Sequence, residues 1–299
     1  MRGDVAARAD ELRALRVPFV LAKVVLVERP TSAKPGDEAI VLADGTMEGF
    51  VGGTCAESTV RAQALALLDS RESLLMRITA VVDADHPGKL VVHNPCLSGG
   101  SLEIFLEPVV PAPRVVVVGD TPIARALASI GERLGYEMAR GNHAAVGAAV
   151  PTDAQAVVVA SHGRDEEAAL IAALDAGVSY VGLVASRARG NAVVAALDVC
   201  AARKAAVHTP AGLDIGASTP EEIALSILAE IVASRPRPTG RAVPADGVGS
   251  TSTALDPVCG MQVAMVDASL HFDHGGARWW FCGSGCLRAF AASPDVYTT

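Results

Sequence analysis

The stretch Arg114-Val115-Val116-Val117-Val118-Gly119-Asp120-Thr121-Pro122-Ile123-Ala124 decides the fold of the middle of this chain. Four consecutive valines, with no polar alternation, indicate a strand that is buried on both faces, as strands of parallel sheets are. The glycine turn after them leads into a helix that we expect over residues 123–134. A strand that passes into a helix in this way is the first half of a βαβ unit.

The same alternation of strand and helix continues toward the C-terminus. Apolar strands that alternate with helices predict a parallel sheet covered by helices on both faces. Residues 114–233 are therefore expected to form a Rossmann-like, doubly wound domain of the α/β class. Its strands are expected at 114–118, 156–160 and 180–184, and its later helices at 166–174, 192–202 and 220–232.

Residues 1–107 predict a mixed α+β domain, which the proline-rich segment 108–113 separates from the parallel sheet. β-rich runs surround two helical patterns, and Ala43-Asp44-Gly45-Thr46 is a turn signal between two of the strands. Helices are expected at 5–15 and 57–68, and strands at 19–27, 39–42, 90–93 and 102–106.

The C-terminal part predicts a small, cysteine-rich domain at the end of a tether. Residues 234–255 are rich in Pro, Gly, Ser and Thr, which is typical of a flexible linker. Residues 256–299, called the knuckle below, hold Cys259, Cys282 and Cys286 together with both tryptophans of the chain.

These three cysteines predict a metal site. Three thiolates bind Zn or Cu(I) and leave one coordination position open, for which His271, His274 and water are all candidates. Three buried cysteines in a small core are the simpler alternative. We rank it lower, because so short a segment buries too little apolar surface to fold without an ion.

Bulk composition excludes several classes of function. The chain has 299 residues and a net charge of -8, so neither nucleic acid nor an anionic membrane is an expected partner. No apolar run reaches the length of a membrane span, and Pro18 and Lys23 within the run 17–27 favour a strand over a signal peptide. A reducing compartment is expected, with the six cysteines as thiols or metal ligands.

The segment Gly52-Gly53-Thr54-Cys55-Ala56-Glu57 is the first candidate binding site. Paired glycines allow a ligand to approach the backbone closely. Cys55 is expected at a helix N-terminus, where free amides stabilise a thiolate that could contact a cofactor. A tight turn followed by a small buried cysteine fits the pattern equally well.

The turn after the valine strand is a weak dinucleotide signal. Gly119 fits the fingerprint and Ala124 is a tolerable third position, but Thr121 stands where a second glycine is needed. Asp120 would also repel a pyrophosphate. NAD(P) or FAD binding is therefore weakly supported, and a Rossmann-like scaffold without a tightly bound dinucleotide is at least as well supported.

Two further segments, at 160–165 and 182–187, follow predicted strands, at the edge where open α/β sheets bind ligands. A third, the glycine-bounded loop 209–217 ahead of the last helix, points to the same edge. A histidine there suits an acid, a base or a phosphate contact, and a hydroxyl with a guanidinium at a helix start suits an anion. A solvated loop histidine and a plain connector are the alternatives. We expect one anionic pocket lined by His162, Ser186, Arg187, Gly212, Asp214 and Gly216.

Four stretches carry a resemblance to known families. They are Lys34-Pro35-Gly36-Asp37 through Gly52-Gly53-Thr54-Cys55-Ala56-Glu57, Tyr180-Val181-Gly182-Leu183 through Ser186-Arg187, Thr209-Pro210 through Gly216 with Thr219-Pro220-Glu221-Glu222-Ile223-Ala224, and the cysteine segment from Asp256 to Pro294. The first three resemble the XdhC/CoxI/CoxF family of maturation factors for molybdenum hydroxylases such as xanthine dehydrogenase and CO dehydrogenase. The fourth resembles a YHS domain, a small treble-clef-like metal module.

The resemblance implies a cytoplasmic, non-catalytic chaperone. Such a protein binds molybdenum cofactor (molybdopterin) transiently, assists its modification and inserts it into the apo large subunit of a hydroxylase. A cysteine desulfurase and a second copy of the chain are compatible partners. The family cysteine falls on Cys55, and the first histidine of the family's Thr-His-Asp-His strand end falls on His162.

Two other functions compete with this one. The first is a nucleotide-dependent oxidoreductase that uses the Rossmann-like domain, and the degraded turn at Thr121 argues against it. The second is a metal sensor or metallochaperone that works through the knuckle. The intact Gly-Gly-Thr-Cys and Gly-Leu-Asp-Ile-Gly segments argue against that being the whole function.

Overall fold

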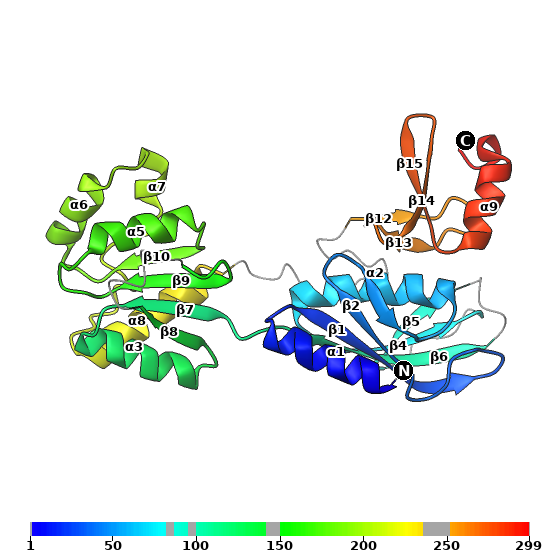
Figure 1. The fold of residues 1–299 in the computed structure, drawn as a ribbon, viewed down its shortest axis with the longest axis horizontal. Coiled ribbons are helices and arrows are strands. Elements are labelled where there is room, and N and C mark those ends of the chain that lie inside the picture. Colours follow the sequence, from blue (N-terminus) through cyan, green and yellow to red (C-terminus); the bar gives the residue numbers. More distant parts are fainter. Residues whose placement is uncertain (1, 82–86, 95–99, 142–149, 236–251, 299) are drawn as a thin grey trace. The chain divides into compact units, whose positions relative to one another are not determined.

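The computed structural model describes residues 2–81, 87–94, 100–141, 150–235 and 252–298, and these form two compact units (Figure 1). Unit 1 combines Met1–Pro111 with Pro238–Thr299, and unit 2 is Ala112–Arg237. Each unit has its own sheet, so the predicted α/β class with a Rossmann-like part is confirmed. Within the described residues, no helix has both the length and the apolar character needed to cross a membrane.

Unit 2 is built on a five-stranded parallel sheet. Val115 and Val117 pack with the core on one face, and Val116 and Val118 pack with the core on the other, so the valine strand is buried on both sides as predicted. The strand order is β11-β10-β9-β7-β8. The strands are β7 (Arg114–Val118), β8 (Glu137–Gly141), β9 (Ala154–Val159), β10 (Tyr180–Leu183) and β11 (Val207–His208).

Helices cover both faces of this sheet (Figure 1). Threonine side chains cap two of them: Thr121 accepts from the amide of Ala124, and Thr219 forms a capping box with Glu222. On one face lie α3 (Pro122–Arg133) and α8 (Pro220–Ala233), and on the other α5 (Glu166–Asp175) and α6 (Arg187–Ala196), with α7 (Ala201–Ala205) leading to β11.

The helix expected at 192–202 is wrong in its limits. Ser186 caps a helix that begins at Arg187 and ends at Ala196, and the next residue, Leu197, has an extended backbone and a side chain buried in the core. The edge strands β8 and β11 were also not predicted. The residues of β8 are only half-buried or exposed and β11 has two residues, so neither shows a clear apolar pattern.

The first part of unit 1 is a six-stranded mixed sheet with the order β3-β2-β1-β6-β4-β5. Residues along β1 alternate between two cores: Phe19 packs with α1 (Arg2–Ala14), whereas Val20 and Ala22 pack with α2 (Thr54–Ser70). The strands are β1 (Phe19–Glu28), β2 (Glu38–Leu42), β3 (Met47–Gly49), β4 (Leu74–Thr79), β5 (Leu90–His93) and β6 (Ser101–Val109).

The knuckle, together with the strand Thr253–Leu255 that precedes it, consists of two β-hairpins and one helix packed around Phe290, which is fully buried. Ala264 and Val266 of the knuckle pack against Ala62 and Leu65 of α2, a contact that the sequence did not predict. Most of the predicted linker, residues 236–251, lies outside the described residues. The elements are β12 (Thr253–Leu255), β13 (Gln262–Ala264), β14 (Leu270–His274), β15 (Ala277–Phe281), α9 (Ser284–Ala292) and a 3-10 turn (Pro294–Val296).

Replacing Gly119 with alanine should destabilise unit 2. The φ of Gly119 is +117°, and an added Cβ would clash with the carbonyl oxygen of Ala160, so the ends of β7 and β9 would have to separate. We expect a loss of about 1–3 kcal/mol in the free energy of unfolding, measured by urea denaturation. Gly135→Ala is the matched control, since its φ is +81° and no described atom lies within 4 Å of the added Cβ. Equal losses in the two variants would contradict the close approach.

Candidate functional site

The three cysteines of the knuckle meet in one cluster. Cys259 lies between β12 and β13, Cys282 follows β15, and Cys286 lies in the first turn of α9. The Sγ atoms of Cys259 and Cys282 are 3.5 Å apart, and those of Cys282 and Cys286 are 3.8 Å apart. Together with the carboxylate of Asp256, the ligand atoms of the group all lie within 4.8 Å of one another.

The two sulfur–sulfur distances suit a metal ion. A tetrahedral ion with metal–sulfur bonds of about 2.3 Å holds its sulfur atoms roughly 3.8 Å apart. Among the three thiols, a hydrogen bond from Cys282 lowers the pKa of Cys259, while the same bond raises the pKa of Cys282 and burial raises the pKa of Cys286. Ionising all three thiols requires a cation between them, because like charges at this spacing repel.

Asp256 holds the cluster together and was missed by the sequence reasoning. Its buried carboxylate accepts hydrogen bonds from the amides of Val258 (2.9 Å) and Cys282 (2.8 Å), which fixes the Cys259 turn against the end of β15. A carboxylate oxygen also completes the donor set for a fourth coordination position. The only signal in the sequence was an aspartate three residues before the first cysteine.

The two histidines that the sequence left open as ligands lie outside this group. His271 Nδ1 lies 2.9 Å from the carbonyl oxygen of Ser269, and His274 Nε2 lies 3.8 Å from Asp295. Among the described residues, the metal-binding group comprises Asp256 and the three cysteines.

Cys55 lies in the first turn of α2, which begins at Thr54 and thus three residues earlier than expected. The N-cap Gly53 provides no side-chain hydrogen bond, and no described atom lies within 4 Å of where a Cβ on Gly53 would stand. Gly52 has a φ of +140°, which only glycine adopts readily. Glu57 donates its amide to the carbonyl oxygen of Gly53. The glycine pair therefore opens space above uncapped helix amides, which suits an anionic ligand.

A hydrogen bond from Asn94 holds the backbone of Cys55 in place. The side-chain amide of Asn94, which is fully buried, donates to the carbonyl oxygen of Cys55 (3.1 Å) and to the hydroxyl of Thr59 (3.3 Å). The Cys55 side chain packs against the apolar core of the knuckle. Its Sγ lies 3.3 Å from a Cβ built on Gly283. The sequence predicted neither the hydrogen bond from Asn94 nor the packing of Cys55 against the knuckle.

The candidate residues of unit 2 follow four neighbouring strands at one edge of the sheet. Because the strands are parallel, their carboxyl ends share that edge: Gly119 follows β7, His162 follows β9, Arg187 follows β10 and Gly212 follows β11. Counted from β7, the strand order is 2-1-3-4-5, and ligands in such sheets bind where the order reverses, here between β7 and β9. A shared pocket at this edge stays a prediction.

Two carboxylates, the buried Glu166 and the half-buried Glu230, fix the loops at this edge, and neither role was predicted. Glu166 accepts from the guanidinium of Arg189 (2.6 and 3.0 Å) and from the amide of Gly163 (2.7 Å). Burial alone would raise the pKa of Glu166, but these donors outweigh it and hold the pKa below its usual range. The hydroxyl of Ser186 accepts a hydrogen bond from the amide of Arg189 and so caps α6. Asp214 and Gly216 lie exposed in the loop after β11.

Glu230 plays the same part for the loop after β11. It accepts from the hydroxyl of Tyr180 (2.6 Å) and the amide of Gly212 (2.7 Å), and His208 Nδ1 lies 3.0 Å from its other oxygen. These hydrogen bonds hold the Gly212 loop in one conformation. In the sequence, a glutamate near the end of an expected helix was indistinguishable from a solvated one.

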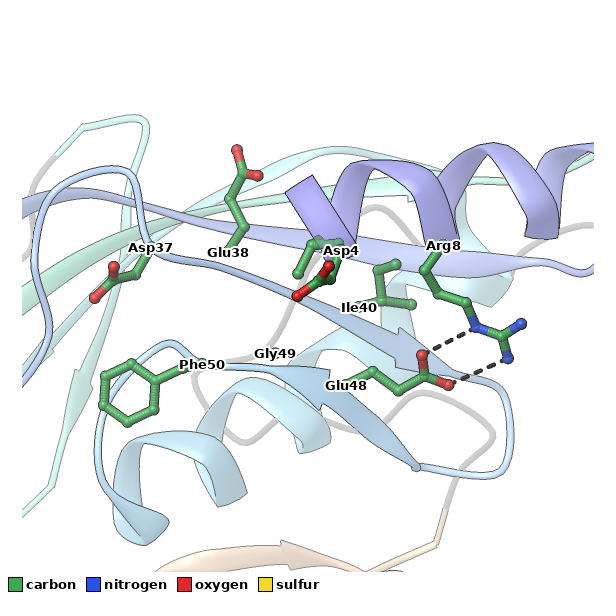
Figure 2. A pocket seen from close by; sticks show the side chains of 9 residues that line it. Asp4, Arg8, Asp37, Glu38, Ile40, Glu48, Gly49 and Phe50 are labelled. Atoms are coloured by element: carbon green, nitrogen blue, oxygen red, sulfur yellow. Dashed lines mark hydrogen bonds and ion pairs between the residues drawn. The ribbon is translucent and has the colours of Figure 1, made fainter. Parts of the chain in front are cut away.

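A pocket of about 280 Å³ lies in unit 1 where the sequence predicted no site (Figure 2). Arg8 donates two hydrogen bonds to Glu48 (3.0 and 3.2 Å), and Glu38 pairs with Lys23 (2.8 Å). The excess of carboxylates disfavours a phosphorylated ligand there. The lining residues are Asp4, Val5, Arg8, Asp37, Glu38, Ile40, Glu48, Gly49 and Phe50.

Comparison with known proteins gives three family matches. The XdhC and CoxI family matches residues 12–79, the XdhC Rossmann domain matches residues 115–231, and the YHS domain matches residues 254–299. The chain is thus an α/β protein in which two domains match the XdhC family models and a third, C-terminal domain matches the YHS model. It belongs to the XdhC and CoxI family and carries a YHS domain, as its sequence predicted.

One curated relative is the uncharacterized protein YqeB of Escherichia coli (strain K12), which is 28% identical over 255 residues. The match covers 77% of this chain and 46% of YqeB, so the chain spans about half the length of that relative. A crystal structure described as a xanthine dehydrogenase from Bacillus halodurans is 16% identical, with 78% of this chain and 97% of that chain covered. Its TM-score is 0.37.

Removing metal should unfold the knuckle and leave the rest of the chain folded. So small a segment depends on metal binding for much of its folding free energy. We expect one ion per chain by elemental analysis, and a large change on chelation in the emission of Trp279 and Trp280, the only tryptophans. The main thermal transition should persist.

Cys282→Ser should lower the metal content, whereas Cys200→Ser, at an exposed thiol of unit 2, should leave it at one ion per chain. Unchanged tryptophan emission in protein shown to be metal-free would mean that the three cysteines are packing residues.

Proposed function

We propose that the chain is a cytoplasmic accessory protein that binds molybdenum cofactor and delivers it to the large subunit of a molybdenum hydroxylase. Membership of the XdhC and CoxI family supports a role in maturation of such enzymes. The observation that carries the binding step is the position of Cys55, in the uncapped first turn of α2 beside the open space at Gly53.

The residues at this turn fit the chemistry of the cofactor. A pterin cofactor supplies a sulfur-ligated metal and an anionic phosphate. Cys55 presents sulfur, a ligand type that soft metal centres accept, and the N-terminal amides of α2 attract negative charge. Independently of this turn, Arg187, exposed in the first turn of α6, is a cationic position of unit 2 that suits a phosphate.

A metallochaperone role through the knuckle is the second candidate, because three cysteines and Asp256 form a complete donor set. The ion is Zn or Cu(I), and a carboxylate as fourth ligand favours Zn. An oxidoreductase role has no such support, since Asp120 at the turn after β7 is an exposed carboxylate paired with Arg125 (3.0 Å).

Cys55→Ser should reduce cofactor handling without unfolding the protein. Oxygen is a harder ligand than sulfur, so the variant loses a ligand for soft metals, but serine has nearly the shape of cysteine and the melting temperature should stay nearly unchanged. The measurement is activation of an apo-hydroxylase by cofactor released from a purified molybdoenzyme, with Cys200→Ser as the control. Full activation with Cys55→Ser would remove Cys55 from the mechanism.

Arg187→Ala should weaken binding of a phosphorylated pterin. A charge-assisted contact contributes about 1.5–3 kcal/mol, so the dissociation constant of neopterin monophosphate should rise by roughly tenfold or more in fluorescence titrations. Arg203→Ala is the control, since Arg203 belongs to α7, which precedes β11 and thus lies toward the opposite edge of the sheet. Equal affinity of the Arg187 variant and the unaltered protein would exclude this residue from the pocket.

A further inference from the structure

The first turns of α2 and α9 meet at the metal cluster. Cys55 of α2 packs with the buried core that contains Cys282 and Cys286. Its Sγ lies 3.3 Å from a Cβ built on Gly283, which is the N-cap of α9 and the neighbour of Cys282 in the chain. A thiol from outside the knuckle therefore packs against the core that holds two of its three cysteines.

Cys55 is close to the cluster but is not one of its resident ligands. The described group whose ligand atoms lie within 4.8 Å of one another consists of Asp256, Cys259, Cys282 and Cys286. Cys282 and Cys286 are buried, whereas Cys55 and Cys259 are half-buried and so more accessible to solvent.

We propose that Cys55 is the exchange ligand through which the metal ion enters and leaves the knuckle. The Cys55 thiol releases its proton to solvent as its sulfur bonds to the ion. The bond from the ion to Cys259, the half-buried resident ligand, breaks, and that thiolate takes up a proton from solvent. The bonds from the ion to Cys55 and to the other resident ligands then break as donor atoms of an external chelator replace them, each thiolate takes up a proton from solvent, and no oxidation state changes.

The inference rests on the proposed metal site and makes Cys55 common to both proposed roles. The sulfur atom that binds the molybdenum cofactor would then also control how the metal ion of the knuckle enters and leaves. Cofactor binding at Cys55 would then block ion exchange, and the two events would exclude each other in time.

The test measures the rate at which a Zn²⁺-loaded chain transfers its ion to a chromophoric chelator, by stopped-flow absorbance. Cys55→Ser should slow transfer by roughly tenfold, which corresponds to about 1.4 kcal/mol in activation free energy. The equilibrium affinity for Zn²⁺ should stay unchanged, because Cys55 is not a resident ligand. An unchanged rate overturns the proposal, and so does a matching loss of affinity, which would make Cys55 a resident ligand.

Glycine variants separate the contact from the thiol itself. Gly283→Ala keeps every cysteine but inserts a methyl group between Cys55 and the knuckle, so transfer should slow as it does in Cys55→Ser. Gly285→Ala is the matched control in the same helix turn, since no described atom lies within 4 Å of its added Cβ. Equal rates for the two glycine variants would overturn the proposal.

The stoichiometry of Zn²⁺ in each preparation distinguishes the two failures. A chain that binds no Zn²⁺ disproves the metal site itself and the exchange role with it. A chain that binds one Zn²⁺ and transfers it at the same rate with and without Cys55 keeps the metal site and loses only the exchange role.

Discussion

The burial of α2 on two sides is the constraint on which unit 1 depends. Val60, Ala64 and Leu67 pack on the six-stranded sheet, while Ala62 and Leu65 pack against the knuckle. Apolar side chains on two sides of one helix have to be covered on two faces. Each of these leucines contributes about 1.5–3 kcal/mol when fully buried, so covering both sides fixes the helix and with it the position of its first turn. The chemistry of Cys55 follows from that position.

The sequence predicted the helices and strands better than it predicted which of them pack against one another. The valines of β7 indicate a doubly buried strand because four in succession leave no polar face. Ala62 and Leu65 lie on a helix whose sheet-facing residues already account for its apolar character, so nothing in the pattern shows that a second layer covers them. The contact depends on residues about 200 positions away, and periodicity within one helix carries no information at that range.

The candidate sites show the same division. Cys259, Cys282 and Cys286 were identifiable because closely spaced thiols, in a segment too small to fold on its core alone, are typical of metal ligands. Asp256, Glu166 and Glu230 were not, because a carboxylate in a loop or on a helix is usually solvated. Their roles appear only when the fold brings backbone amides to them, as in the hydrogen bond from Cys282 to Asp256.

Unit 1 is discontinuous in the sequence: its two pieces, Met1–Pro111 and Pro238–Thr299, enclose the whole of unit 2. During synthesis, the Rossmann-like unit leaves the ribosome and can fold before the knuckle has been made. Until then the outer face of α2, with Leu65 and the Cys55 thiol, lacks the layer that covers it in the finished protein. The fold of unit 1 is thus completed only after its second piece has been made, and a nascent chain cannot present the finished sulfur site before then.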